Sequence, residues 1–282
     1  MVWALVTGAR GMLGTALLST APETVAPTGV DLEDGDLSQP EVGGGLLLRY
    51  QPQVVIHCAA MTDVDGCTRE PERAMLHNGT ATRRLAEACA AVGARLLYIS
   101  TDYVFPGDLG RPYVETDEPR PLNPYGESKL AGERAVAELR DHVIVRTQWL
   151  YGPGGRNFIA TIVKAARPRN TLRVVSDEFG SPTYVRDLAP ALWRAALAEV
   201  RGILHVTNSG VCCWADLARL AVAAAGLDVT VEPITAAEWG SITVRPRYSP
   251  LANRRWVEEL GYPPLRPWQE PVTEYVSEFL RE

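Results

Sequence analysis

The stretch Val2–Gly14, VWALVTGARGMLG, contains the pattern that decides the fold. Its first part, Val2 to Val6, is an apolar run too short for a helix, and it predicts a buried strand. Gly8, Gly11 and Gly14 follow with G-x-x-G-x-x-G spacing, and a short helix is predicted directly after them. Such a turn lets the backbone approach a pyrophosphate, and the helix N-terminus offers unpaired N–H groups. We therefore predict a strand–turn–helix unit that binds a dinucleotide.

Composition limits the class of protein. The chain has 282 residues, 46% of them hydrophobic, which suffices for one large domain or a domain with a smaller lobe. The net charge is −6 without any basic run, so we expect no nucleic-acid partner. No apolar run reaches membrane-spanning length and the N-terminus lacks the basic start of a signal peptide, so we expect no membrane partner. The 5 cysteines show no C-x-x-C, which favours a reducing, cytoplasmic location.

Short apolar runs alternate with helical patterns along the first half of the chain. Strands are predicted at 54–56, 96–99 and 143–145, and helices at 79–92 and 128–139. This alternation is typical of a parallel sheet with helices on both faces. Beyond about residue 150 the periodicity weakens, which indicates a second lobe packed on the sheet. We therefore predict an α/β fold with a Rossmann-type, doubly wound parallel sheet.

The end of the second strand is expected to bind the adenosine ribose of the dinucleotide. We predict that this strand ends near Val25 to Thr28, and spacing places Thr28 at the ribose. An acid there would favour NAD through the ribose 2′-hydroxyl, and Asp31 is near enough to leave this open. Arg10 in the glycine loop is either a solvated cation or a planar donor to a 2′-phosphate. We expect NADPH as the cofactor, with NADH possible.

Tyr125 and Lys129 lie four residues apart after a strand that ends in Ser100-Thr101-Asp102. Positions i and i+4 share one helix face, so a phenol and an ammonium can converge there with the Thr101 hydroxyl. A free tyrosine has a pKa of about 10, which a nearby lysine cation would lower. The alternative is an ordinary pair on an exposed helix surface.

Six motifs occur in order along the chain: VTGARGMLG, VVIHCAAMTDVDGCTREP, LLYISTDYVFPG, PYVETDEPRPLNPYGESKLAGE, VIVRTQWLYG and FGSPTY. Together they resemble the dTDP-4-dehydrorhamnose reductases, a family of extended short-chain dehydrogenases/reductases. The resemblance covers nearly the whole chain. The STDYVF and PLNPYGESKLAGE blocks are the specific ones, since the glycine loop and Y-x-x-x-K alone would indicate only the superfamily.

The resemblance implies reduction of a ketone. NAD(P)H would deliver hydride to C4 of dTDP-4-dehydro-β-L-rhamnose, with Tyr125 as the proton donor and Lys129 on the nicotinamide ribose. Thr101 and the Asp102 backbone would orient the carbonyl oxygen, and Trp149 would contact the sugar or be a core aromatic. The catalytic residues are thus Thr101, Tyr125 and Lys129, and the substrate residues Thr101, Asp102 and Trp149. The expected cofactor-binding residues are Gly8, Arg10, Gly11, Met12, Leu13, Gly14, Asp36, Leu37, Ala60, Met61, Thr62, Tyr125 and Lys129.

The resemblance also divides the chain. It assigns residues 1–150, with parts of 174–225 returning to them, to an NAD(P)-binding Rossmann domain. Residues 151–173 and 226–282 form a smaller C-terminal substrate-binding lobe. The expected partner is a dTDP-sugar, and the expected assembly is a monomer or homodimer.

Several positions depart from the family pattern. The family often has R-T-S-W where this chain has Arg146-Thr147-Gln148-Trp149, so we expect the sugar pocket to differ at Gln148. Some members bridge a dimer with Mg²⁺ through glutamates, but Ala16 and Arg186 occupy the corresponding positions. His57 and Cys58 replace a common Asn-Ala, inside a predicted buried strand without further ligands at metal spacing. We therefore predict no metal site.

Other functions compete with the reduction of dTDP-4-dehydrorhamnose. A 4,6-dehydratase needs an Asp-Glu pair after the catalytic threonine, and this chain has Asp102-Tyr103. Another nucleotide-sugar reductase or a C4 epimerase stays open, although an epimerase would not consume NAD(P)H stoichiometrically. A non-catalytic subunit that resembles the regulatory β-subunit of methionine adenosyltransferase also stays open.

Overall fold

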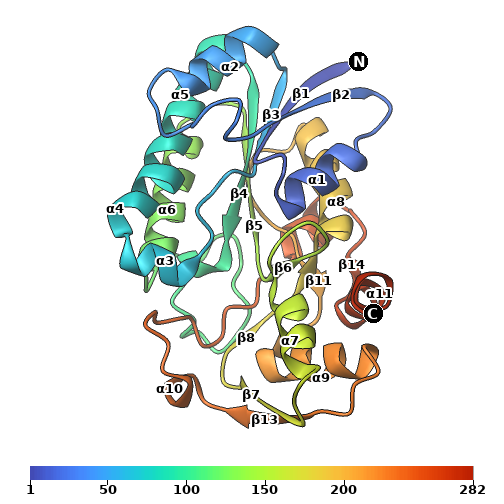
Figure 1. Ribbon diagram of the computed structural model, residues 1–282. Coiled ribbons are helices and arrows are strands. Elements are labelled where there is room, and N and C mark those ends of the chain that lie inside the picture. The colour runs from blue at the N-terminus through green and yellow to red at the C-terminus, as the bar shows by residue number, and fades with distance from the viewer. Residues whose placement is uncertain (282) are drawn as a thin grey trace.

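A six-stranded parallel sheet forms the centre of the molecule, with strand order β10–β5–β4–β3–β1–β2 (Figure 1). The structure is a computed structural model and describes residues 1–281. The inner strands are rich in Val, Ile and Leu because parallel strands are buried on both faces. The strands are β1 (Val2–Thr7), β2 (Val25–Val30), β3 (Val54–His57), β4 (Arg95–Thr101), β5 (His142–Thr147) and β10 (Gly202–His205).

Helices cover both faces of this sheet, as the sequence predicted. On one face α1 (Met12–Ser19) and α8 (Val185–Leu197) pack against β1, β3, β4 and β5 in one apolar cluster. On the other face α2 (Val42–Tyr50), α5 (Ala81–Val92) and α6 (Pro124–Ala137) form a second cluster with the same strands. The doubly wound α/β prediction is therefore confirmed.

Strand β2 is longer than predicted, which moves the expected ribose position. Thr28 pairs with Leu5 in the middle of the strand, and Asp31 is the first residue beyond its end. The placement of Thr28 at the ribose was therefore wrong. The strand continues through Pro27 because β2 is an edge strand, where a missing proline N–H is tolerated.

The chain reverses direction across the sheet between β1 and β3. It runs outward from β1 to β2 and then returns to the other side of β1 as β3. The connections after β1 and β3 therefore lead to opposite sides of β1, and ligands bind at such a switch point in open α/β sheets. The two loops touch at Gly8, where an added Cβ would lie 2.7 Å from the Ala59 backbone nitrogen.

A second lobe lies below the carboxyl ends of the strands (Figure 1). It contains α7 (Phe158–Ala166), α9 (Trp214–Ala224), α11 (Gln269–Phe279) and the parallel pair β7 (Thr171–Val175) with β13 (Thr230–Ile234). Within residues 1–281 no helix is long and apolar enough to cross a bilayer. The remaining elements are α3 (Val64–Arg69), α4 (Pro71–Ala74), α10 (Ala236–Trp239), β6 (Leu150–Tyr151), β8 (Phe179–Gly180), β9 (Thr183–Tyr184), β11 (Asn208–Ser209), β12 (Cys212–Cys213), β14 (Leu265–Pro267), the 3-10 turn Asp102–Val104 and the π-helical turns Met75–Thr80 and Arg255–Glu259.

A buried ion pair joins helix α6 to the sheet. Arg146 of β5 donates to Glu133 of α6 from Nε at 2.8 Å and from Nη2 at 2.7 Å. Ser100 of β4 donates its hydroxyl to the same carboxylate at 2.5 Å. Both charged side chains are almost fully buried, so each neutralises a charge that would be costly alone. The pair fixes the helix that carries Tyr125 and Lys129 against β4 and β5.

Arg146→Met should lower the free energy of unfolding by about 3–5 kcal/mol, because the Glu133 carboxylate would remain buried without its partner. Urea unfolding of the wild type and the variant measures this. The double variant Arg146→Met/Glu133→Leu removes both charges and should recover most of the loss. A single-variant loss of less than about 1 kcal/mol, the value typical of a surface pair, would contradict the structural role of this pair.

Candidate active site

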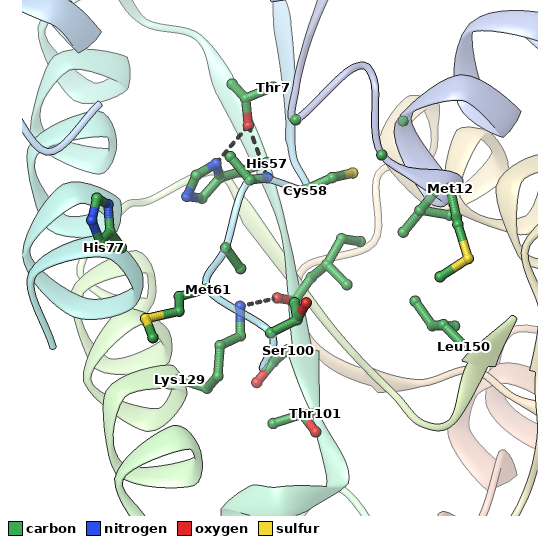
Figure 2. A pocket seen from close by; sticks show the side chains of 18 of the residues that line it. Thr7, Met12, His57, Cys58, Met61, His77, Ser100, Thr101, Lys129 and Leu150 are labelled. Atoms are coloured by element: carbon green, nitrogen blue, oxygen red, sulfur yellow. Dashed lines mark hydrogen bonds between the residues drawn. The ribbon is translucent and has the colours of Figure 1, made fainter. Parts of the chain in front are cut away.

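A cleft of about 690 Å³ opens at the carboxyl ends of β1, β3 and β4, between the sheet and the second lobe. Figure 2 shows Met61 and Lys129 on one side of it and Met12 with Leu150 on the other. Every predicted site residue except Arg10 lines this cleft. These are Gly8, Gly11, Met12, Leu13, Gly14, Asp36, Leu37, Ala60, Met61, Thr62, Thr101, Asp102, Tyr125, Lys129 and Trp149.

The glycine loop has the shape that a diphosphate requires. Gly8 has φ +66°, a conformation that favours glycine, and an added Cβ on Gly14 would lie 2.2 Å from the Gly8 carbonyl oxygen. Gly11 is the N-cap of α1 and no side chain caps this helix end. The backbone can therefore approach a phosphate closely and offer it N–H groups, so the residues fit a dinucleotide.

Arg10 was expected to bind the cofactor, but it does not line the cleft. Its guanidinium pairs with Glu33, and its backbone N–H donates to the Asp31 carboxylate at 2.8 Å. The segment between β2 and α2 contains five acids, Asp31, Glu33, Asp34, Asp36 and Glu41, and the first two of them hold the arginine. Asp31 lines the cleft where an acid favours a free ribose 2′-hydroxyl.

Asp36 and Leu37 lie beside Asp31 in the same part of the cleft. The Asp36 carboxylate accepts the Ser38 backbone N–H at 2.8 Å, and this hydrogen bond is the main reason why the pKa of Asp36 is lowered. The loop is thus held by its own side chain and presents a charged and an apolar residue side by side. That arrangement suits the edge and face of an adenine.

Asn78 holds the wall formed by Ala60, Met61 and Thr62. Its Oδ1 accepts the Met61 N–H at 2.8 Å, while its Nδ2 donates to the Met61 carbonyl and the Ser128 hydroxyl, both at 3.0 Å. Asn78 sits in the π-helical turn, a distortion frequent at functional sites. It connects the cofactor wall to helix α6, and the sequence reasoning missed it.

His57 is a buried structural residue. Its Nδ1 lies 2.7 Å from the Thr7 hydroxyl (Figure 2). Its Nε2 lies 3.1 Å from the Thr82 hydroxyl. Burial lowers the pKa of His57 to about 3, so the ring is neutral at physiological pH. Within residues 1–281 no group of three or more His, Cys, Asp or Glu residues could hold a metal ion. The absence of a metal site stays a prediction.

Helix α6 presents Tyr125 and Lys129 to the cleft. Asn123 caps the helix by accepting the Gly126 N–H at 2.9 Å, and Pro124 occupies the first turn, where it needs no donor. Lys129 is 3% exposed; its ammonium donates to the Ile99 carbonyl at 2.7 Å and lies 4.1 Å from the Tyr98 ring centroid. Burial lowers the pKa of Lys129 to about 7, against the opposing effect of the Glu133 carboxylate.

The predicted lowering of the Tyr125 pKa is not what this structure shows. Burial raises the pKa of Tyr125, and a hydrogen bond with Thr101 only partly offsets that effect. The Lys129 ammonium is directed to the Ile99 carbonyl and the Tyr98 ring, so it does not act on the phenol here. The Tyr125 side chain is consequently a neutral donor.

Asp102 uses its side chain to hold the active-site threonine. The Thr101 hydroxyl donates to Asp102 Oδ1 at 3.1 Å, and Ser249 donates to Oδ2 at 2.6 Å. Burial raises the pKa of Asp102 to about 7 despite these hydrogen bonds. Because Ser249 comes from the C-terminal part of the chain, Asp102 also connects the sheet to that part.

Two tryptophans stack at the second-lobe side of the cleft. Trp149 has φ +49°, which is unusual for a bulky residue, and its ring stacks on Trp214 with centroids 3.5 Å apart. Trp214 Nε1 donates to the buried Glu178 carboxylate at 3.1 Å. An added Cβ on Gly180 would lie 2.6 Å from the Trp149 ring, so this glycine leaves room for it.

The sequence reasoning missed several cleft residues. Trp214 begins a predicted helix and gave no separate signal. Arg156 follows two glycines in the loop YGPGGRN, which was predicted only as a loop. The missed residues that line the cleft include Arg73, His77, Arg156 and Trp214.

Comparison with known proteins gives consistent matches over the whole chain. A family model described as "RmlD substrate binding domain" matches residues 2–281. The dTDP-4-dehydrorhamnose reductase of Streptomyces griseus is 45% identical, over 96% of this chain and 91% of the relative. The spore coat polysaccharide biosynthesis protein SpsK of Bacillus subtilis is 40% identical, over 99% of this chain and 98% of the relative. The crystal structure of dTDP-4-dehydrorhamnose reductase from Bacillus anthracis in complex with NADP has a TM-score of 0.94 and 36% identity, and covers 98% of this chain and 99% of its own.

Asp31→Asn should improve binding of NADP⁺ relative to NAD⁺, because a carboxylate beside a 2′-phosphate repels it. Two unit charges ~4 Å apart repel by about 1 kcal/mol in water, so the ratio of the two dissociation constants should change several-fold. Asparagine can still accept the Arg10 N–H, so the loop should be retained. Titration calorimetry with both dinucleotides measures the ratio, with Glu23→Gln at the opposite end of the sheet as control. An unchanged ratio would mean that Asp31 does not face the ribose.

Lys129→Met should raise the melting temperature of the protein while it impairs cofactor binding. The pKa of Lys129 is about 7 in the folded chain and about 10.4 when unfolded. Between these values the unfolded chain binds more protons, so this residue lowers stability increasingly as pH falls from 10.4 to 7. Thermal melts at pH 6 and pH 10 test this: the gain should be large at pH 6 and nearly vanish at pH 10. A wild type more stable than the variant at pH 6 would refute it.

Proposed function

We propose that this chain, which belongs to the RmlD substrate binding domain family of dTDP-4-dehydrorhamnose reductases, reduces the C4 ketone of dTDP-4-dehydro-L-rhamnose to dTDP-L-rhamnose with NAD(P)H. One observation carries the proposal. Thr101, Tyr125 and Lys129 line the same cleft as the glycine loop. A proton donor and a nicotinamide dinucleotide can therefore act on one carbonyl group.

The bound dinucleotide supplies hydride, and the residues of this chain bind, orient and transfer the proton. Gly8, Gly11 and Gly14 receive the diphosphate, and Lys129 holds the hydroxyls of the nicotinamide ribose. Because the chemistry is the cofactor's, the contribution of the protein is positioning and electrostatics.

Tyr125 gives its proton to the ketone oxygen as that oxygen becomes an alkoxide. Burial raises the pKa of Tyr125, so the phenol keeps its proton until a stronger base forms beside it. The Thr101 hydroxyl donates to Asp102 in the free protein, and reorients to bind the substrate oxygen. Asp102 and Ser249 limit how far that hydroxyl can move.

The stacked pair Trp149 and Trp214 forms the sugar side of the proposed substrate site. Its flat apolar surface suits the ring and the methyl group of a deoxysugar. Glu178 fixes the Trp214 ring through the indole N–H, so the pair is held before substrate arrives.

NADPH is the proposed cofactor, and NADH is accepted as well. The Bacillus anthracis enzyme is in complex with NADP, which supports NADPH. Asp31 at the end of β2 suits the free 2′-hydroxyl of NADH. We further propose a cytoplasmic monomer or homodimer without a bound metal, with the division into dinucleotide-binding domain and substrate-binding lobe given above.

The decisive experiment mixes purified protein, dTDP-4-dehydrorhamnose and NADPH or NADH. We expect one equivalent of reduced nicotinamide to be consumed for each sugar reduced, measured by absorbance at the nicotinamide band. Conversion of a dTDP-sugar that bears a C4 hydroxyl into its C4 epimer, without net consumption of reduced nicotinamide, would indicate an epimerase. No turnover with any dTDP-sugar, together with co-purification of a synthetase, would indicate a regulatory subunit.

Tyr125→Phe should lower kcat by about 10²–10⁴-fold, the usual contribution of a general acid, because only the proton donor is lost. The phenylalanine ring can keep the edge contact that Tyr125 makes with Tyr103, so NADP⁺ affinity should stay near the wild-type value. Steady-state kinetics and calorimetry measure the two effects. Turnover within a few-fold of wild type would exclude Tyr125 as the proton donor.

A further inference from the structure

The loop Gly152–Asn157 connects β6 to α7 and crosses from the second lobe to the start of α1. Its path is fixed by contacts that leave no room for side chains. A Cβ on Gly155 would lie 2.5 Å from Met12 Cγ, and one on Gly152 would lie 2.3 Å from Val185 Cγ2. The backbone beside Arg156 therefore packs directly on Met12, the first residue of the helix that follows the glycine loop.

Asn157 holds this loop in place. Its amide nitrogen donates to the Gly152 carbonyl at 3.1 Å, the Gly155 carbonyl at 3.3 Å and the Tyr275 hydroxyl at 3.0 Å. Its Oδ1 accepts the Ala160 N–H at 2.9 Å and so caps α7. Since Asn157 is 8% exposed, these bonds are shielded from water and the position of the loop is well defined.

Arg156 lines the cleft from this fixed loop, and its side chain is exposed. Among the ion pairs formed by residues 1–281, other arginines near the cleft have acidic partners. Arg10 pairs with Glu33, and Arg73 pairs with Glu70. No carboxylate within residues 1–281 forms an ion pair with the Arg156 guanidinium. Arg156 is therefore a cation in the same cleft as the glycine loop, and its charge is available to a ligand.

We propose that Arg156 binds the diphosphate of a bound nucleotide, opposite the backbone N–H groups of the glycine loop. The inference rests on the proposed function, which brings two diphosphates into this cleft. The glycine loop offers dipoles but no cation toward the cleft, since Arg10 is turned to Glu33. A guanidinium fits two phosphate oxygens at once and supplies the missing positive charge.

The contact with Met12 favours the diphosphate of the dinucleotide over that of the dTDP-sugar. The first turn of α1 is where the dinucleotide phosphates would lie. Arg156 belongs to the second lobe, so its contact would join the lobe to the bound cofactor. Both sources share the same chemistry, and separate probes distinguish them.

The test is titration calorimetry of the full chain with NAD⁺, NADP⁺ and dTDP, each added alone. Arg156→Gln keeps much of the side-chain length without the charge, and Arg156→Lys keeps the charge without the planar fork. Arg140→Gln, an exposed arginine before β5 at the opposite end of the sheet, is the matched control. Melting temperatures of all variants verify that they fold.

We expect Arg156→Gln to raise the dissociation constants of NAD⁺ and NADP⁺ equally, by about tenfold. The affinity for dTDP should be unchanged, and the control variant should bind all three nucleotides like the wild type. Arg156→Lys should recover part of the loss. Weaker binding of dTDP alone would mean that Arg156 contacts the diphosphate of the substrate and not that of the dinucleotide. Weakening of NADP⁺ alone would overturn the proposal, because the contact would then be to the 2′-phosphate. Normal binding of all three nucleotides by Arg156→Gln would overturn the proposal and leave the proposed function intact, whereas a wild type that binds none would refute both.

Discussion

The close contact between Gly8 and the loop after β3 is the constraint on which the site depends. Only a residue without a side chain can lie there, since a Cβ would approach the Ala59 nitrogen to 2.7 Å. This contact brings the phosphate-binding loop next to the wall of Ala60, Met61 and Thr62. Asn78 then connects that wall to Ser128 on helix α6, so the glycine loop and the helix with the proposed catalytic residues are held at one spacing.

Burial of Lys129 on helix α6 lowers the stability of the protein. Lys129 and Glu133 are one turn apart and both almost fully buried, but only Glu133 has a charged partner in direct contact, Arg146. Lys129 has only a carbonyl oxygen and an aromatic face, which solvate an ammonium less well than water. A bound dinucleotide, with its hydroxyls and negative charge, would complete this site. Burial of an incompletely paired cation is therefore reasonable only at a position that binds a ligand.

The sheet, and the fact that Tyr125 and Lys129 line one cleft, could be predicted from the sequence because both follow local rules. Buried strands read as apolar runs, and Tyr125 and Lys129 have helical spacing. Helix α2 was missed because Gly43, Gly44 and Gly45 disfavour a helix, and its Leu46 and Leu47 pack on α5 instead. Helix α11 was missed because Pro271 suggested a loop, although proline is tolerated in a first helical turn. The Trp149–Trp214 stack and the position of Arg156 depend on contacts between distant segments, which no local pattern encodes.

The most direct test of the account follows the hydride itself. Reduced nicotinamide deuterated at C4 on each face in turn, incubated with the protein and dTDP-4-dehydrorhamnose, should place one deuterium at C4 of the rhamnose product. One of the two labelled faces should donate, and the other should not, which NMR of the purified sugar will reveal. A reduced sugar that carries no deuterium at C4 with either label, or a ketone that stays unreduced, would contradict hydride transfer at this site.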